Sequence, residues 1–338
     1  MKAFCVTDAF GMEHAAVREL PTPVRAPGQV LLRVLSASLN YRDWLVARGE
    51  YNPRFRLPLV LGSDAVAEIV ELDEIAQERG FSVGDRVCPC MAQAWVSGAP
   101  DRAVTQRTLG GPLPGVLAEF LAVRADSISR VPAYLSDDEA ATLPCAALTA
   151  WSALRELSQV SPDDWVLTMG SGGVALFALQ IARLAGARVL SLSRTEQKQA
   201  ALSELGASLT ASSAAAGWGA AVRELVGGAG VDHVIEIGGA TTMQESLQAV
   251  RPGGTISWIG TVGGRATMPD LLGVMMRNVR LQGVFVGHRV GFENMLSRFA
   301  EAELRPVIDR TFTLADAAEA FSRLASGDQF GKICVRIA

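Results

Sequence analysis

Hydrophobic and polar positions divide the chain into two regions with different periods. Up to residue 125, short apolar runs are separated by glycine, proline and polar clusters, which is typical of short strands joined by turns. Val30–Ala37, Ala65–Leu72 and Val116–Val123 are such runs, and Met1–Asp8 is expected to form an edge strand. This spacing predicts a compact β-rich domain, built as a partly closed barrel.

Beyond this region, helical and strand periods alternate. Ser136-Asp137-Asp138-Glu139 fits a capping box and predicts the start of a helix. Trp165–Met169 is apolar throughout, and the residues from Val174 to Leu184 repeat at helical spacing. Further strands are predicted at Arg188–Leu192, Val231–Ile237, Thr255–Gly260 and Val279–Val286, with helices at Gln197–Leu205 and Met243–Val250 between them.

The alternation predicts an α/β domain with a parallel, doubly wound sheet and a cofactor at the carboxyl ends of its strands. The tail from Thr311 to Ala338 adds one more helix and one more strand. We therefore expect a dinucleotide-binding domain, residues 126–288, inserted into a β-rich catalytic domain made of residues 1–125 and 289–338. The substrate is expected between the two domains.

A glycine-rich turn carries the strongest functional signal. Gly170-Ser171-Gly172-Gly173-Val174-Ala175 fits G-x-G-x-x-A, follows a predicted strand and opens a predicted helix. Gly170 permits a tight turn, and Gly172 lets a pyrophosphate approach the backbone. The free N–H groups and the dipole of the helix start favour phosphate. Dinucleotide contacts are expected from Gly170, Ser171, Gly172, Gly173 and Val174.

The end of the next strand indicates which dinucleotide binds. NAD sites usually place Asp or Glu there, but this chain has no carboxylate between Ser191 and Glu196. Ser193 can donate a hydrogen bond to a 2′-phosphate, and Arg194 and Lys198 can pair with its charge. We therefore expect NADP(H) as the cofactor. The alternative is that Arg194 and Lys198 are solvated charges at a helix start.

Composition and charge argue against a nucleic-acid-binding, secreted or membrane-spanning protein. The 338 residues are 49% hydrophobic and carry a formal net charge of −4, so no basic excess favours nucleic acid. Charge near the first residue argues against a signal peptide, and Arg183 and Arg188 interrupt the longest apolar stretch, which argues against a membrane span. The five cysteines are scattered and odd in number, which suits a reducing, cytoplasmic location.

The chain resembles the medium-chain dehydrogenase/reductase superfamily over essentially its whole length. The resemblance implies a Rossmann domain inserted into a GroES-like catalytic domain. It rests on eight segments: Ser38–Asp43, Leu59–Asp64, Gly84–Val87, Gly115–Phe120, Leu143–Trp151, Gly170–Ala182, Gly253–Thr255 and Phe330–Lys332.

The departures from the family pattern concern zinc. Zinc alcohol dehydrogenases carry a Cys ligand within the segment that matches Leu39–Asp43, and Gly-His-Glu where this chain has Gly62-Ser63-Asp64. Only Cys145 matches a ligand, and a catalytic zinc needs three. Cys88-Pro89-Cys90 has no second cysteine pair for a structural zinc. We expect no metal, with Cys145 as a small buried hydrophobe, although Asp43 and Asp64 could in principle bind a hard cation.

The zinc-free branch resembles quinone oxidoreductases and enone reductases. There an Asn and a Tyr line the nicotinamide site, and these positions match Asn40 and Tyr51. Either side chain could stabilise charge on the substrate carbonyl oxygen during hydride transfer, and Tyr51 or water could then supply a proton. The alternatives are a turn residue that bonds its own backbone for Asn40, and a loop aromatic that covers apolar surface for Tyr51.

The resemblance implies further contacts. Ile237, Gly238, Ile259 and Gly260 would border the nicotinamide ribose, Phe285 and Val286 would meet the carboxamide, and Lys332 would close the cleft. An apolar pocket is expected from Asn40, Tyr51, Met91–Ser97, Gly110–Gly115 and Val262–Met276. The strand Val279–Val286 would pair two copies into a homodimer.

The leading function is an NADPH-dependent, metal-free reductase of quinones or α,β-unsaturated carbonyls. A zinc-independent alcohol dehydrogenase or ketone reductase on the same fold is the second reading. A non-catalytic NADPH-binding protein is the third, because fold alone does not decide function.

Overall fold

The computed structural model describes residues 1–264 and 270–337, and the chain forms two compact units. The first contains residues 1–148 and 286–338, and the second contains residues 149–285. The expected boundary at residue 125 therefore lies too early. Helix α3 (Asp137–Ala141) packs against β3 (Gln29–Ser38) and β16 (Lys332–Arg336), so the segment after residue 125 belongs to the first unit.

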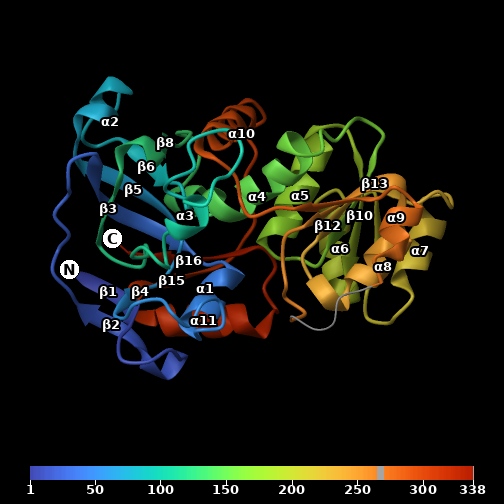
Figure 1. The fold of residues 1–338 in the computed structure, drawn as a ribbon, viewed down its shortest axis with the longest axis horizontal. Coiled ribbons are helices and arrows are strands. Elements are labelled where there is room, and N and C mark those ends of the chain that lie inside the picture. Colours follow the sequence, from blue (N-terminus) through green and yellow to red (C-terminus); the bar gives the residue numbers. More distant parts are fainter. Residues whose placement is uncertain (265–269, 338) are drawn as a thin grey trace. The chain divides into compact units, whose positions relative to one another are not determined.

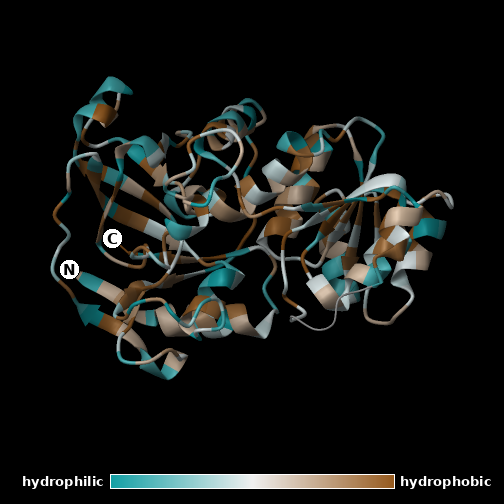
Figure 2. Cartoon of the chain, in the orientation of Figure 1, coloured by the Kyte–Doolittle hydropathy of each residue, from teal (hydrophilic) through white to brown (hydrophobic). Residues whose placement is uncertain are grey.

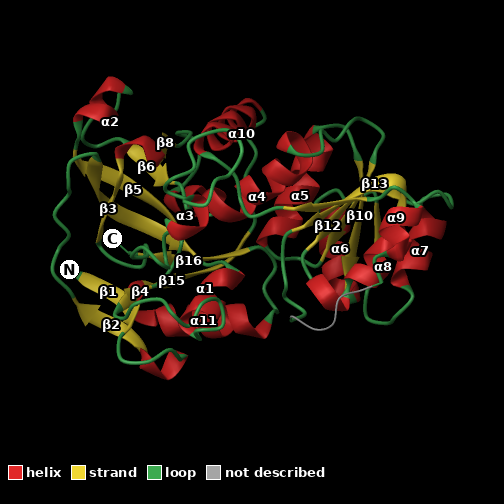
Figure 3. Cartoon of the chain, viewed as in Figure 1, coloured by secondary structure: helices red, strands yellow, loops and turns green. Residues whose placement is uncertain are grey.

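A seven-stranded sheet organises the first unit (Figure 3). Its strand order is β15-β16-β3-β5-β6-β8, and β7 also pairs with β3. The strand from the chain's last residues thus lies beside one of its first, as expected for an inserted domain. The remaining strands are β5 (Asp64–Glu71), β6 (Arg86–Pro89), β7 (Phe120–Arg124), β8 (Ile128–Arg130) and β15 (Ile308–Thr313).

The N-terminal strand lies in the middle of a second, smaller sheet. β1 (Lys2–Val6) pairs with β2 (Ala15–Glu19) on one side and with β4 (Leu59–Val60) on the other. The expectation of an edge strand is therefore wrong. The prediction failed because the alternation of polar and apolar residues does not show how many neighbouring strands pair with a strand. The helices of this unit are α1 (Tyr41–Ala47), α2 (Glu74–Glu78), α3, α10 (Arg289–Glu301) and α11 (Ala317–Ser326).

The second unit contains a parallel six-stranded sheet in the order β11-β10-β9-β12-β13-β14. In chain order this is 3-2-1-4-5-6, the doubly wound order of dinucleotide-binding folds. Figure 1 shows helices on either side of this sheet. The strands are β9 (Trp165–Met169), β10 (Arg188–Ser193), β11 (Leu209–Ser212), β12 (Val231–Glu236), β13 (Val250–Trp258) and β14 (Arg280–Gly283).

Strand β14 is shorter than the predicted Val279–Val286. Gly283 pairs with Trp258, the last residue of β13, and the Val284 N–H donates to the Trp258 oxygen at 2.9 Å, so the residues after Val284 have no β13 residue to bond. The helices of this unit are α5 (Gly173–Leu184), α6 (Glu196–Glu204), α7 (Trp218–Leu225), α8 (Met243–Ala249) and α9 (Leu272–Met276), and the short α4 (Leu148–Trp151) begins at the boundary.

Each unit has its own apolar core, and Figure 2 shows hydrophobic residues along the central strands of both. Phe4, Leu32 and Phe321 belong to the first core, and Leu167 and Leu190 belong to the second. Each such side chain contributes roughly 1.5–3 kcal/mol on burial. Within residues 1–264 and 270–337, no helix has the length and hydropathy required to cross a bilayer.

Candidate active site and cofactor site

A buried polar cluster lies where three strands of the first unit meet α1. The register explains how it assembles: in β3, Ser38 pairs with Cys334 of β16 on one side and with Asp64 of β5 on the other. Lys332 is the first residue of β16, and Asn40 directly precedes α1. Residues almost 300 positions apart therefore meet. The cluster consists of Asn40, Asp43, Ser63, Asp64 and Lys332, of which all but Asn40 are buried.

Lys332 is the cation of this cluster. Its Nζ donates hydrogen bonds of 2.6 Å to the backbone oxygen of Leu39 and of 2.6 Å to Oδ1 of Asn40. Asp64 Oδ2 lies 3.9 Å from the same ammonium group. Lys332 was expected to contact the cofactor, but in this structure its ammonium group is engaged inside the first unit.

The amide of Asn40 has a fixed orientation. Its oxygen accepts from Lys332, while its Nδ2 donates to Asp64 Oδ2 at 2.8 Å and approaches Ser63 Oγ at 3.4 Å. The reversed amide would place NH₂ against an ammonium group and an oxygen against a carboxylate, which neither partner can satisfy. Asn40 is also the N-cap residue of α1, and the Asp43 side chain accepts a hydrogen bond from the Asn40 backbone N–H at 2.8 Å.

Burial sets the protonation of the two carboxyl groups. Desolvation raises the pKa of Asp64 to about 7, against the lowering effects of Lys332 and of hydrogen bonds from Asn40 and the Cys145 backbone. Desolvation also raises the pKa of Asp43, and the nearby Arg42 opposes it. The Asp43 Oδ1 atom accepts a hydrogen bond of 2.8 Å from Ser63 Oγ. The cluster therefore changes charge near neutral pH.

Arg42 connects the second predicted catalytic residue to this region. Its guanidinium group donates to the backbone oxygens of Leu109 at 2.9 Å and Gly111 at 3.2 Å, and it lies 5.1 Å from the centre of the Tyr51 ring. The Leu109 N–H in turn donates to Met91. Arg42 thus brings together Tyr51, the predicted glycine-rich loop and the Met91 segment. Among the described residues, the Tyr51 hydroxyl has no hydrogen-bond partner.

The glycine-rich turn of the second unit has the form that a dinucleotide needs. Gly170 follows β9 with a φ of 75°, which favours glycine. A Cβ added at Gly172 would meet no atom within 4 Å, so the backbone faces open space there. Helix α5 begins at Gly173 without a side-chain cap, and Ala175 is buried against the sheet. These residues fit a bound pyrophosphate.

The residues predicted to select the 2′-phosphate lie between β10 and α6. Ser193 is buried, Arg194 is exposed directly after the strand, and Lys198 is in the first turn of α6. Arg194 makes no ion pair with another described residue. Because the Ser193 hydroxyl is buried, Arg194 is the stronger candidate for contact with a phosphate.

The predicted nicotinamide contacts lie at the ends of β12 and β13. The Gly260 and Ile259 N–H groups donate to the Glu236 backbone, and the Val262 N–H donates to Ile237 at 3.2 Å. Gly238, Ile237, Ile259 and Gly260 are therefore neighbours, as expected for one subsite. Phe285 is partly exposed and Val286 is buried. The sequence interpretation missed Glu236, a buried acid in an apolar strand.

Sequence models of two domains match this architecture. One, described as an alcohol dehydrogenase GroES-like domain, matches residues 26–133, and the other, described as a zinc-binding dehydrogenase, matches residues 173–301. A zinc-type alcohol dehydrogenase-like protein from Schizosaccharomyces pombe is 34% identical over 97% of this chain and 96% of its own length. The chain belongs to the medium-chain dehydrogenase/reductase superfamily.

Other members of the superfamily carry more specific descriptions. An acryloyl-coenzyme A reductase from Metallosphaera sedula is 30% identical over 94% of this chain and 95% of its own. A solved NAD-dependent alcohol dehydrogenase is 30% identical with a TM-score of 0.89, and covers 100% of both chains. The 2-octenoyl-CoA carboxylase reductase CinF, solved with NADP and 2-octenoyl-CoA, is 25% identical with a TM-score of 0.88, covering 99% of this chain and 87% of its own.

The protein is therefore an oxidoreductase of the medium-chain dehydrogenase/reductase type that uses a pyridine nucleotide. Its donor set does not suit the catalytic zinc of this superfamily. Asn40 is bonded to an ammonium group, and the Ser63 hydroxyl is bonded to Asp43. Burial raises the pKa of the Cys145 thiol to about 12, so the thiolate that zinc prefers is disfavoured. Part of the Cys145 residue reaches the surface although its thiol is desolvated, so the expected small buried hydrophobe is only partly buried.

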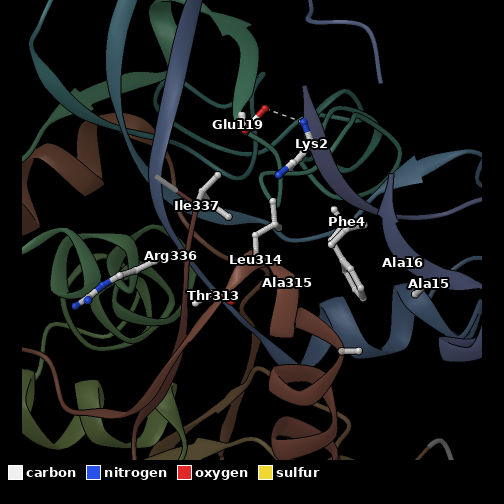
Figure 4. A pocket seen from close by; sticks show the side chains of 12 residues that line it. Lys2, Phe4, Ala15, Ala16, Glu119, Thr313, Leu314, Ala315, Arg336 and Ile337 are labelled. Carbon is white, nitrogen blue, oxygen red and sulfur yellow. Dashed lines mark hydrogen bonds between the residues drawn. The ribbon is translucent and has the colours of Figure 1, made fainter. Parts of the chain in front are cut away.

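A groove of about 790 Å³ lies elsewhere in the first unit, between β1, β2 and the start of α11 (Figure 4). Phe4, Leu314 and Ile337 contribute its apolar surface, and Lys2 and Glu119 lie at one side. No member of the Asn40 cluster lines it. Of the residues predicted for a substrate pocket, Met91 is buried in the interior, Met275 and Met276 are exposed, and Met268 lies outside the described residues.

Proposed function

We propose that this oxidoreductase reduces quinones or α,β-unsaturated carbonyl compounds, uses NADPH as the reductant and needs no metal. The observation that carries the proposal is the orientation of Asn40. Within the segment that carries a metal ligand in zinc-dependent members of the superfamily, the chain holds an amide between a buried cation and a buried carboxylate. A polarised amide is a donor for a developing oxyanion.

In the proposed reaction, Asn40 binds the substrate carbonyl oxygen and Tyr51 or water supplies a proton. When bound, NADPH supplies the hydride that reduces the β-carbon of the conjugated substrate. Asn40 Nδ2 is held firmly by Asp64 at 2.8 Å but only weakly by Ser63 at 3.4 Å. The weakly held N–H is therefore the one that turns to the substrate carbonyl oxygen. The Tyr51 hydroxyl, or water, then supplies the proton for the α-carbon.

Two features support NADPH as the reductant. Arg194 is exposed at the end of β10 without an ion-pair partner among the described residues, and no acidic residue stands at the position that usually contacts a ribose 2′-hydroxyl. The acryloyl-coenzyme A reductase and CinF, solved with 2-octenoyl-CoA, support α,β-unsaturated carbonyl compounds as substrates. The acyl-CoA compounds in both names carry a C=C bond conjugated to a thioester carbonyl.

We also propose that two copies pair through β14, one of the two edge strands of the parallel sheet. Met275 and Met276 of α9, next to it in sequence, are 67% and 70% exposed. An exposed strand edge beside exposed methionines is a surface that a second copy of this chain would cover.

The test is to follow oxidation of NADPH and of NADH with phenanthrenequinone, an aliphatic enone and an aliphatic ketone, each with and without a metal chelator. Turnover of the quinone or enone with NADPH, unaffected by the chelator, is expected. Asn40→Ala should lower kcat, and Tyr51→Phe should lower kcat only if its hydroxyl donates the proton. Turnover of the ketone alone would favour a ketone reductase, and loss of activity with the chelator would refute the metal-free mechanism.

A further inference from the structure

A buried carboxylate lies at the crossover point of the parallel sheet. β12 pairs with β9 with Ile235 opposite Thr168, which places Glu236 beside Met169, the residue before Gly170. This is the point where the strand order reverses, and ligands of doubly wound sheets bind outside the strand ends there. Glu236 is completely buried, and none of the described cations pairs with it.

Four donors satisfy this carboxylate. Oε1 accepts from the backbone N–H groups of Gly238 at 2.7 Å and Gly239 at 2.9 Å, and from the Thr242 hydroxyl at 2.5 Å. Oε2 accepts from the Ser246 hydroxyl. All four donors lie in the turn after β12 or in α8, so one side chain fixes the path of the chain from the end of the strand into the next helix.

The turn fixed by Glu236 also supports the end of β13. The Gly263 N–H donates to the Gly238 oxygen at 2.8 Å. A Cβ at Gly260 would lie 2.4 Å from the Ile237 oxygen, and a Cβ at Gly238 would lie 2.3 Å from Thr242 Oγ1. The two strand ends are therefore packed so closely that a displacement of the Gly238 turn moves both of them.

An acid is an unexpected choice at this place. A dinucleotide carries a pyrophosphate, so a negative charge close to its site opposes binding unless the charge is neutralised by donors. A carboxylate can accept these four hydrogen bonds at once, which a neutral amide cannot do. Its function is therefore geometric.

We propose that Glu236 is a positioning residue of the cofactor site, which holds the Ile237–Thr242 turn in the shape that receives the nicotinamide half of the dinucleotide. The inference rests on the proposed NADPH binding. It places the effect of Glu236 on one half of the cofactor, because the adenosine half is expected at the end of β10, where Arg194 lies.

The test compares two ligands and two variants. NADPH contains both halves of the cofactor, whereas adenosine 2′,5′-bisphosphate contains only the adenosine half with its 2′-phosphate. Glu236→Gln is the variant. Glu245→Gln is the matched control, because Glu245 of α8 also accepts two glycine N–H bonds, from Gly217 and Gly219 at 2.7 Å each, but away from the crossover point. Calorimetry gives the dissociation constants, and urea unfolding reports folding.

Glu236→Gln should weaken NADPH binding about tenfold, equivalent to about 1.4 kcal/mol, and leave the bisphosphate within about twofold. Glu245→Gln should leave both ligands within about twofold. Thr242→Val, which removes one donor, should weaken NADPH binding in the same direction and replaces Glu236→Gln if that variant does not fold. Equal weakening of both ligands, or no change in NADPH binding, would overturn the inference. If the wild-type protein binds neither NADPH nor the bisphosphate, the proposed cofactor falls, and the inference falls with it.

Discussion

The interaction between Lys332 and Asp64 can be measured directly with a double-mutant cycle. Lys332→Met keeps the apolar stem and removes the ammonium group, and Asp64→Asn removes the carboxylate charge. At a separation of 3.9 Å, two charges attract by about 4 kcal/mol for an effective dielectric constant near 20. Competition from Asn40, which bonds both groups, lowers this value. We expect a coupling free energy of about 1–3 kcal/mol.

The single variants should differ in their cost. Lys332→Met leaves two acceptors and a buried carboxyl group without their cation, and should lower the free energy of unfolding by about 3–5 kcal/mol. Asp64→Asn should cost less, because an amide can still accept from Asn40. The double variant should be more stable than the sum of the single effects predicts, because both charges are removed together.

Urea unfolding of all four proteins is measured about one pH unit above the Asp64 pKa of about 7, where Asp64 of the wild type is mostly ionised. Repeating the cycle one unit below that pKa should reduce the coupling. Lys2→Met in place of Lys332→Met is the control, because Lys2 is exposed and forms no ion pair within the described residues. A coupling below about 0.5 kcal/mol at the higher pH would refute the arrangement described for the cluster.

Three further predictions concern the cofactor, the pH dependence and the assembly. Arg194→Asp should raise the Kd for NADPH about tenfold to a hundredfold and change that for NADH little, because one charge-assisted bond to a phosphate is lost; equal changes in calorimetry would refute the assignment. The pKa of Asp64 is raised from 3.8 to about 7 in the folded state, so its contribution to stability is present at low pH and is lost as the pH rises through about 7. Asp64→Asn should therefore gain up to about 4 kcal/mol relative to the wild type between these two pH values, measured by urea unfolding; parallel curves would contradict the shift. Met275→Asp should convert a dimer into a monomer in light scattering, whereas Val24→Asp, also at an exposed residue, should not; an unchanged mass would exclude this face.

The sequence predicted the parts of the fold that local patterns encode. The βαβ unit around Gly170 and the capping box at Ser136 are present as expected. Strand β11 was not predicted, because its residues Leu209–Ser212 are mostly small and polar and show no strand period. The number of partners of β1 and the early end of β14 depend on neighbouring strands, which no local pattern contains.

In the candidate site, too, local patterns identified individual residues but not the distant residues that bond to them. Asn40 and Tyr51 were found by resemblance, but the bonds that orient Asn40 come from Lys332, almost 300 residues later, through the register of β16 on β3. Glu236 could have been found, because it stands between Ile235 and Ile237 at the buried end of the predicted strand Val231–Ile237, where an acid must have buried donors. Its four partners, however, are set by the three-dimensional path of the turn.

The pairing of β16 with β3 has a consequence for synthesis. Residues 149–285 contain all six strands of their sheet and can fold as soon as they leave the ribosome. The first unit must wait, because Ile333 and Val335 complete its core and β16 covers one edge of β3. During translation the edge of β3 that β16 covers therefore stays open until Lys332–Arg336 has been synthesised, and an open strand edge is prone to aggregate.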